Sequence, residues 1–185
     1  MKILFVCTGN TCRSPMAEAI CRDEMTRRGI PGEAASAGLS PLPGDMTNPL
    51  TLQVLAGHGV PAEAKPAVPL TPELLAASDV VAVMTRQHAD LLARVLPPVR
   101  PKLRVLDVCD PYGGGPDEYE QCYRQLRAAV DRLLAGAEAS GEAAENENAQ
   151  KRAVPDEAGG SAAESAAPAE AADAVPRPGE GTPHA

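Results

Sequence analysis

Residues 1–18, MKILFVCTGNTCRSPMAE, decide the fold of this chain. The apolar run Lys2–Val6 is rich in β-branched and aromatic residues, which predicts a strand buried on both faces of a parallel sheet. From Ser14 on the pattern becomes helical, with Ser14 as a cap and Pro15 at the first helical position. The loop Cys7–Arg13 therefore joins the carboxyl end of a strand to the amino end of a helix. Backbone N–H groups converge at such a junction, and together with the helix dipole they favour an anion.

This loop carries a thiol and a guanidinium with five residues between them. The loop amides, the helix terminus and Arg13 all stabilise a thiolate at Cys7, which predicts a nucleophile at neutral pH. Arg13 offers a planar fork that can hold two phosphoryl oxygens and follow them into the transition state. A lone cysteine is more often an inert buried residue. The Cys-x5-Arg-Ser pattern between strand and helix favours the catalytic interpretation instead.

The segment CTGNTCRSP, residues 7–15, resembles the signature loop of the low-molecular-weight protein tyrosine phosphatase family. The resemblance covers about residues 1–134, and it implies hydrolysis of a phosphorylated protein through a phosphocysteine intermediate. It implies that Cys7 is the nucleophile, Arg13 the phosphate clamp and Ser14 the hydroxyl that eases departure of the thiolate. Asn10 would brace the loop. The implied substrate- and phosphate-binding set is Thr8, Gly9, Asn10, Thr11, Cys12 and Ser14.

Composition divides the chain near Ala135. Residues 136–185 carry ten acidic and three basic side chains, so they hold seven of the eight net negative charges. They contain no Leu, Ile, Met or aromatic residue and cannot bury enough apolar surface to offset the entropy of ordering. We expect a phosphatase domain over residues 1–135 and a disordered acidic tail, rich in Ala, Glu and Pro, over residues 136–185. A solvated extension is favoured over a regulatory or partner-binding tail.

Charge and hydropathy narrow the function classes and the location. The near-neutral domain, with 2% aromatic residues in the whole chain, argues against nucleic-acid binding. No segment approaches the roughly 20 apolar residues that cross a bilayer, and no signal-type leader precedes Cys7. Five cysteines, an odd number, fit reduced thiols better than a disulfide framework. We therefore expect a cytoplasmic enzyme whose partners are phosphorylated proteins, with no nucleic acid and no membrane.

Strands and helices are expected to alternate along the rest of the domain. The first helix should close near Gly29. Alternation implies right-handed βαβ units, hence a three-layer α/β/α fold of the Rossmann-like type with a four-stranded parallel sheet, as the resemblance also implies. Ligands in such folds bind beyond the carboxyl ends of the strands, where the Cys7 loop lies. The further expected elements are strands over 34–37, 79–84 and 102–107 and helices over 50–56, 71–76, 85–96 and 116–134.

A second chemical element follows the expected fourth strand, in the sequence Cys-Asp-Pro-Tyr-Gly-Gly-Gly of residues 109–115. Parallel topology opens this loop at the same end of the sheet as Cys7. Asp110 could therefore protonate the leaving atom and then, as a carboxylate, activate the water that hydrolyses phosphocysteine. By itself an Asp-Pro turn would be ordinary, but it matches the family's acid loop, with Tyr112 as its supporting aromatic. The family also implies a hydrogen bond from Ser36 to Asn10, although a plain strand-to-turn signal is as good an explanation of Ser36.

The remaining cysteines and histidines leave fewer options. Cys12 is either a spare thiol able to bond Cys7 or a small loop residue. The three histidines lack metal-ligand spacing, and Arg13 with the loop amides supplies the positive charge, so we expect no metal and no cofactor. Structural roles are expected for Cys21, Cys109 and Cys122.

Thr11 decides the predicted substrate. The protein arginine phosphatases of this family carry threonine where tyrosine-directed members have isoleucine or leucine, and residues 69–88 and Gly113-Gly114 also resemble that subgroup. Tyr112 instead matches the tyrosine-directed members. We predict hydrolysis of phosphoarginine in proteins, with phosphotyrosine as the alternative. Three alternatives are less favoured: an arsenate reductase, a phosphocysteine carrier and a non-catalytic phosphate-binding module. An arsenate reductase needs further reactive cysteines, and the chain has no cysteine between Cys21 and Cys109.

Overall fold

The structure is a computed structural model that describes residues 1–152, and their side chains up to Gly136. Its sheet has four parallel strands in the order β2-β1-β3-β4. The fold class predicted from the sequence is confirmed. The strands are β1 (Lys2–Cys7), β2 (Glu33–Gly38), β3 (Val80–Val83) and β4 (Leu103–Val105).

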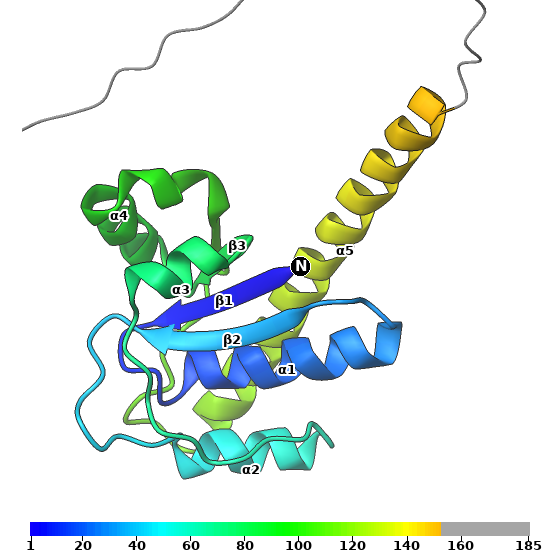
Figure 1. Cartoon of the computed structure of the whole chain (residues 1–185). Coiled ribbons are helices and arrows are strands. Elements are labelled where there is room, and N and C mark those ends of the chain that lie inside the picture. Colours follow the sequence, from blue (N-terminus) through cyan, green and yellow to red (C-terminus); the bar gives the residue numbers. More distant parts are fainter. Residues whose placement is uncertain (153–185) are drawn as a thin grey trace, which may run out of the picture.

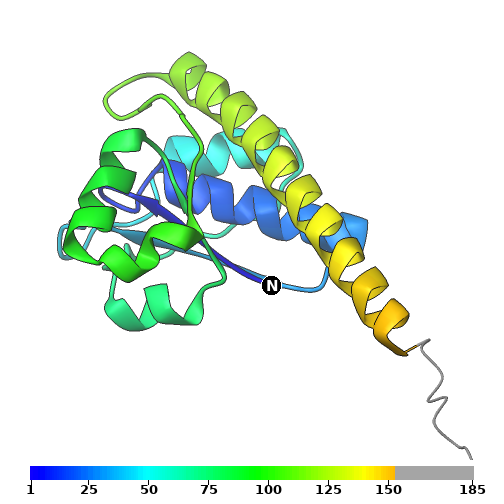
Figure 2. The ribbon, with the colours of Figure 1, turned by 90° about the horizontal axis from the view of Figure 1, so that it is seen from above.

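Helices cover both faces of this sheet. One side carries α1, α2 and α5, and the other carries α3 and α4 (Figures 1 and 2). The central position of β1 places the segment that follows it between the two layers, at the carboxyl edge of the sheet. The helices are α1 (Arg13–Arg28), α2 (Pro49–Gly57), α3 (Pro72–Ala77), α4 (Arg86–Val95), a 3-10 helix (Pro97–Lys102) and α5 (Pro116–Arg152).

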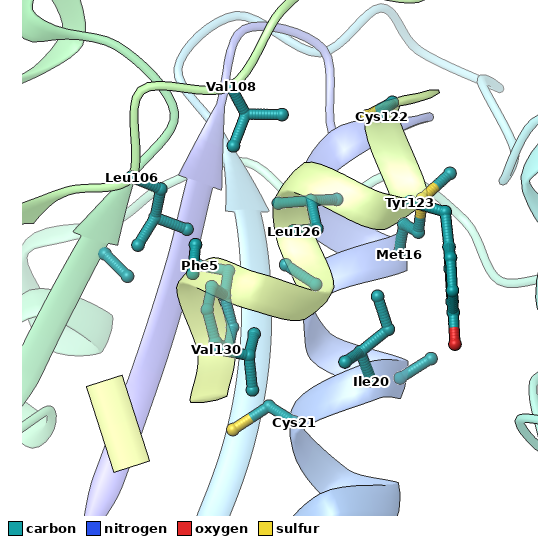
Figure 3. Packing of buried hydrophobic residues seen from close by; sticks show 14 of the residues in the cluster. Phe5, Met16, Ile20, Cys21, Leu106, Val108, Cys122, Tyr123, Leu126 and Val130 are labelled. Carbon is teal, nitrogen blue, oxygen red and sulfur yellow. The ribbon is translucent and has the colours of Figure 1, made fainter. Parts of the chain in front are cut away.

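Strand β1 contributes to the core on both of its faces. Ile3 and Phe5 belong to the cluster formed with α1 and α5, and Leu4 and Val6 to the cluster under α3 and α4. Figure 3 shows Phe5 between the sheet and residues of α1 and α5 such as Ile20 and Leu126. Each such buried side chain contributes about 1.5–3 kcal/mol. Period-2 alternation with apolar residues on both faces explains why β1 is an uninterrupted apolar run.

The start of α1 differs from the prediction. The cap position is Cys12, without a side-chain capping bond, and the helix begins at Arg13. Ser14 is therefore not the cap; it lies in the first turn and its hydroxyl faces Cys7. The helix ends as expected, because Gly29 adopts a left-handed φ of 66° that suits glycine.

The last helix is longer than predicted. It runs from Pro116 to Arg152 and does not end near Leu134, so the expected disorder is corrected for residues 136–152. These residues are rich in Ala and Glu and include no proline, so their helix propensity favours a helix. The rest of the predicted tail, residues 153–185, lies outside the described residues. Within residues 1–152, no helix has the length and apolarity needed to cross a membrane.

Candidate active site

Cys7 is the last residue of β1, and its thiol is buried under the loop that follows. Its side chain is 3% exposed. The backbone N–H of Asn10 donates to Sγ at 3.2 Å, and the Ser14 hydroxyl lies 3.0 Å from Sγ. Both groups can donate hydrogen bonds to a thiolate, which stabilises the charged form. Cys7 thus lies where the sequence pattern predicts it, between strand and loop, whereas Ser14 does not have the predicted role of a cap.

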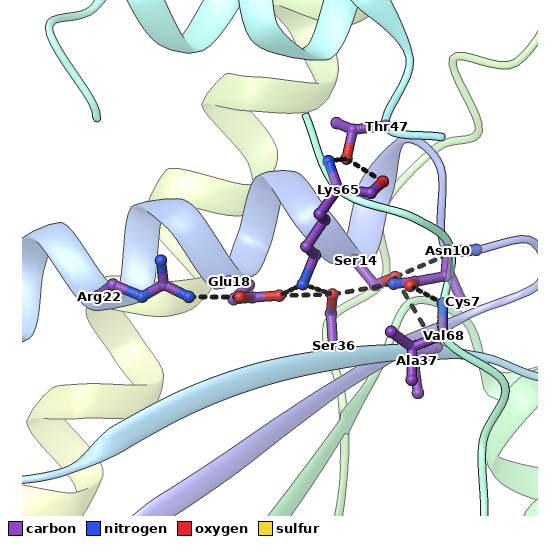
Figure 4. A network of polar contacts seen from close by, with 10 residues as sticks. All are labelled: Cys7, Asn10, Ser14, Glu18, Arg22, Ser36, Ala37, Thr47, Lys65 and Val68. Carbon is purple, nitrogen blue, oxygen red and sulfur yellow. Dashed lines mark hydrogen bonds and ion pairs between the residues drawn. The ribbon is translucent and has the colours of Figure 1, made fainter. Parts of the chain in front are cut away.

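Asn10 holds the loop in its curved conformation. Its backbone has a φ of 55°, a left-handed value that asparagine tolerates better than most residues. Its amide nitrogen donates to Ser14 Oγ and to Ser36 Oγ, both at 2.9 Å, and its Oδ1 accepts from the N–H of Val68 at 2.8 Å (Figure 4). One side chain therefore ties the loop to α1, to β2 and to the segment before α3.

A charged network that the sequence analysis did not foresee supports this arrangement. The Glu18 carboxylate, 6% exposed, accepts from Ser36 Oγ at 2.6 Å and pairs with both Lys65 and Arg22 (Figure 4). Lys65 also donates to Ser36 Oγ at 3.1 Å. Ser36 is thus fixed from the side opposite Asn10. Sequence spacing gives no signal for Lys65, because it reaches the network from a loop 47 residues beyond Glu18.

Gly38, at the end of β2, lets the loop pass close by. A Cβ atom at this position would lie 2.9 Å from the carbonyl oxygen of Thr8 and 3.1 Å from Cβ of Asn10. Such distances are too short for unstrained contacts, so only glycine leaves the loop where it is. The backbone of the same region is also joined to the loop, because the N–H of Ser40 donates to the Thr8 carbonyl at 2.9 Å.

Arg13 and Asp110 meet at the carboxyl edge of the sheet, where parallel topology places both loops. Arg13 is 5% exposed, and its Nη2 donates to Asp110 Oδ2 at 2.5 Å. The other carboxylate oxygen of Asp110 accepts from the N–H of Tyr112 at 3.2 Å, which orders the loop after β4. A guanidinium and a carboxyl group therefore lie together above the thiol loop, although 97 residues separate them in sequence.

A pocket of about 240 Å³ opens over these groups. Most of the predicted loop residues line it, and Thr11 lies on its wall. Two exposed apolar side chains flank it, Leu42 at 67% and Tyr112 at 78% exposure. Ser40, Leu42 and Asp45 were not predicted, since the loop between β2 and α2 carries no motif. The full lining is Cys7, Thr8, Gly9, Thr11, Cys12, Arg13, Ser40, Leu42, Asp45, Asp110 and Tyr112.

All five cysteines are free thiols, in different surroundings. Burial raises the pKa of Cys21 and of Cys122 to about 12, which makes both inert. Cys109 is exposed, so its predicted structural role is not supported by packing. Cys12 is buried, and its Sγ lies 3.1 Å from the hydroxyl of Tyr119, whose pKa burial raises. Both explanations of Cys12 stay open.

A buried thiol on an anion-binding loop, with an arginine in the loop and a carboxyl group across it, defines a cysteine-dependent phosphatase. No group of His, Cys, Asp and Glu among the described residues could hold a metal ion. The comparison with protein families agrees with this class. The model described as "Low molecular weight phosphotyrosine protein phosphatase" matches residues 2–147, and the chain belongs to this family.

Individual relatives carry two kinds of name. A protein-arginine-phosphatase of Bacillus subtilis (strain 168) is 37% identical over 142 residues, which cover 72% of this chain and 94% of the relative. A low molecular weight protein-tyrosine-phosphatase of Streptomyces coelicolor is 36% identical over 151 residues, covering 72% and 92%. Among solved structures, the YwlE arginine phosphatase from Geobacillus stearothermophilus has a TM-score of 0.69 at 31% identity, over 75% of this chain and 94% of that one.

Proposed function

We propose that this chain is a protein phosphatase that hydrolyses phosphoarginine in proteins, with Cys7 as nucleophile, Arg13 as phosphate clamp and Asp110 as general acid and base. The observation that carries the choice of substrate is the polar part of the pocket lining, to which Thr11 and Asp45 belong. The free thiols support a reducing, cytoplasmic location.

The first half of the reaction begins when a phosphoryl group binds to the loop amides and Arg13. Arg13 now holds the Asp110 carboxylate. A phosphoryl oxygen that takes over the guanidinium releases Asp110, which takes up a proton from solvent water and turns to the leaving atom as an acid. The Cys7 thiolate attacks phosphorus, and the bond from phosphorus to the leaving nitrogen breaks. The electron pair goes to that nitrogen, which takes the proton of Asp110.

The second half releases phosphate. The Asp110 carboxylate accepts a proton from a water molecule as the water oxygen attacks the phosphorus of phosphocysteine. The sulfur–phosphorus bond breaks, and its electron pair returns to Cys7. The Ser14 hydroxyl and the Asn10 N–H, which lie 3.0 and 3.2 Å from Sγ, stabilise the thiolate that leaves.

The wall of the pocket suits a guanidinium better than a phenol. The guanidinium of phosphoarginine is cationic and carries N–H donors, which require acceptors once water is excluded. Thr11 supplies a hydroxyl, which lies 3.4 Å from Cys12 Sγ. Asp45 supplies a carboxylate, for which residues 1–136 show no ion pair and no side-chain hydrogen bond. Charge and hydrogen bonding together therefore favour arginine as the leaving group.

Phosphotyrosine is the second candidate, and Tyr112 favours it. The exposed ring of Tyr112 at the mouth of the pocket could stack on a phenol. The other exposed wall residue, Leu42, is not aromatic, so a phenol would find only one aromatic face. The names of the relatives include both activities and do not discriminate between them.

Matched peptides test the substrate choice. We expect a higher kcat/KM on a phosphoarginine peptide than on a phosphotyrosine peptide of the same flanking sequence. Thr11→Ile should shift that ratio about tenfold or more towards phosphotyrosine, because the wall loses a hydrogen-bonding group and gains apolar bulk. Thr11→Ser, which keeps the hydroxyl, is the matched control and should keep the ratio. A wild-type preference for phosphotyrosine would overturn the proposal.

The other reaction classes are separated by simple observations. Thioredoxin-dependent turnover of arsenate would revive the arsenate reductase. Stable phosphocysteine that accumulates without hydrolysis would indicate a carrier, and binding without any turnover would indicate a phosphate-binding module.

A further inference from the structure

The imidazole of His88 joins α4 to the phosphate-binding loop. Its Nε2 lies 3.1 Å from the hydroxyl oxygen of Thr8, and its Nδ1 lies 3.1 Å from the hydroxyl oxygen of Thr85. Thr8 follows Cys7 directly and lines the active-site pocket, whereas His88 lies 80 residues further along the chain. The phosphatase signature of residues 7–15 includes neither His88 nor Thr85.

The hydroxyl of Thr85 is placed to donate to Nδ1 of His88 and so to leave the ring proton on Nε2. Thr85 is the cap of α4, and its oxygen accepts from the backbone N–H of His88 at 3.4 Å. The hydroxyl has one proton to donate, and Nδ1 of His88 is the remaining polar partner recorded for it among residues 1–152. With Nδ1 as the acceptor of that proton, a neutral imidazole carries its own proton on Nε2. Burial and the positive charge of Arg13 lower the pKa of His88, against a smaller opposing effect of Asp110, so the neutral form is favoured.

The hydrogen bond from Nε2 fixes the direction in which Thr8 can donate. Because the Thr8 oxygen accepts from His88, its own proton must point elsewhere, and within the described residues no other acceptor is recorded for it. The pocket that Thr8 shares with Cys7 and Arg13 is the open direction. A phosphoryl oxygen bound there would supply the missing acceptor.

We propose that His88 is a positioning residue that turns the Thr8 hydroxyl towards a bound phosphoryl group, so that Thr8 adds a side-chain donor to the amides of the loop and Arg13. The contact is made to the phosphoryl group and not to the leaving group. The proposal therefore holds for phosphoarginine and phosphotyrosine alike, and it goes beyond the proposed choice of substrate.

The test measures phosphate affinity and turnover separately. Inorganic phosphate is used as a competitive inhibitor, with p-nitrophenyl phosphate and the two matched phosphopeptides as substrates. We expect His88→Ala and Thr8→Val each to raise the inhibition constant of phosphate about tenfold, the usual effect of losing one hydrogen bond to a charged group. The double variant should lose no more than Thr8→Val alone, because His88 acts through Thr8.

Three further variants separate positioning from a structural role. His88→Gln presents an amide donor near the place of Nε2 and should restore most of the phosphate affinity. Thr8→Ser keeps the hydroxyl and should retain most of the phosphate affinity that Thr8→Val loses. Gln87→Ala, an exposed neighbour on α4, is the matched control and should change nothing.

Defined results would overturn the proposal. Independent losses that multiply in the double variant would show that His88 does not act through Thr8. An unchanged inhibition constant in Thr8→Val would remove the proposed donor, and this result stands even if His88→Ala fails to fold. A loss confined to one phosphopeptide would place Thr8 against the leaving group, and would leave the choice between arginine and tyrosine to the Thr11 experiment.

Discussion

The floor and the wall of the active-site pocket are built differently. On the floor, Cys7 and Arg13 are at most 5% exposed and are bonded to groups on α1 and the acid loop. Asn10, which is 1% exposed and does not line the pocket, braces this floor through its hydrogen bond to β2. On the wall, Leu42 and Tyr112 are more than half exposed. The geometry for phosphoryl transfer is thus fixed before any substrate binds, whereas the leaving group meets side chains that hold little else together. Substitutions on the floor should therefore reduce activity strongly on every substrate. Substitutions on the wall should reduce it less and should affect one substrate more than another.

The largest loss is expected at the floor, in Cys7→Ser. A serine hydroxyl in this loop is a much weaker nucleophile than a thiolate, so turnover should fall by about 10⁴-fold or more on every substrate. Single-turnover assays with p-nitrophenyl phosphate and both phosphopeptides measure this. Circular dichroism serves as the control for folding. Retained hydrolysis in a folded variant would exclude Cys7 as the nucleophile.

Asp110 lies between floor and wall, and the loss of activity in its variant should depend on the leaving group of the substrate. Asp110→Asn cannot donate or accept the catalytic proton, so kcat on a phosphopeptide should fall by roughly 10²–10⁴-fold. The loss should be smaller on p-nitrophenyl phosphate, whose leaving group departs without help. Pre-steady-state measurement of the phosphorylation step makes the comparison. An unchanged chemical step with the poorer leaving group would show that another residue supplies the proton.

The hydrogen bonds of Asn10 that brace the floor should contribute to the stability of the folded protein. Asn10→Ala removes the acceptor for the partly buried N–H of Val68 and the side-chain bonds to Ser14 and Ser36, and places alanine at a φ of 55°, so the free energy of unfolding should fall by about 2–4 kcal/mol. Urea denaturation measures this. Asn10→Gly should recover only the part of this free energy that alanine loses by adopting a positive φ. Equal stability of alanine and wild type would mean that the loop keeps its shape without Asn10.

On the wall, a smaller and more selective effect is expected. Asp45→Asn keeps the size of the side chain but removes a charge that faces the pocket, so kcat/KM should fall about three- to tenfold on phosphoarginine, as for the loss of one partly exposed charge contact. It should stay within about twofold on phosphotyrosine, and the unfolding free energy should not change, as is usual for such surface changes. Equal losses on both peptides would assign Asp45 to phosphate binding or to the fold.

The smallest effect concerns pH. The pKa of His88 in the folded protein is lowered from 6.5 by burial and by Arg13, so as the pH falls the unfolded chain binds this proton first. This contribution to stability is present above 6.5 and is lost as the pH falls below it. Urea denaturation from pH 7.5 to 5.5 should show a shallower loss in His88→Gln than in the wild type. Parallel curves would contradict the lowered pKa.

Features that depend on residues close together in the sequence could be predicted from it, whereas features that depend on contacts between distant loops could not. Strand β1, the loop of residues 7–13 and the placement of Asp110 at the same end of the sheet as Cys7 depend on local pattern and on parallel topology, and both can be inferred without coordinates. The direct contact of Asp110 with Arg13 was not predicted. The network of Glu18 and Lys65 could not be foreseen, because it depends on how two loops fold over β2. Ser14 looked like a cap for a local reason, and its hydroxyl is instead used by Cys7 and Asn10. The helical residues 136–152 were misjudged because low hydrophobicity was weighed above helix propensity.

Gly38 carries a consequence for any mutational scan of this chain. It is separated from the substrate by the loop, yet every side chain at this position would meet the backbone of Thr8 and Gly9. Such variants should therefore score as inactive while remaining folded, and would be mistaken for changes in a substrate-contacting residue. The fitness map of the enzyme should accordingly show an intolerant position beneath the loop and a tolerant one at Leu42, the reverse of what proximity to the leaving group suggests.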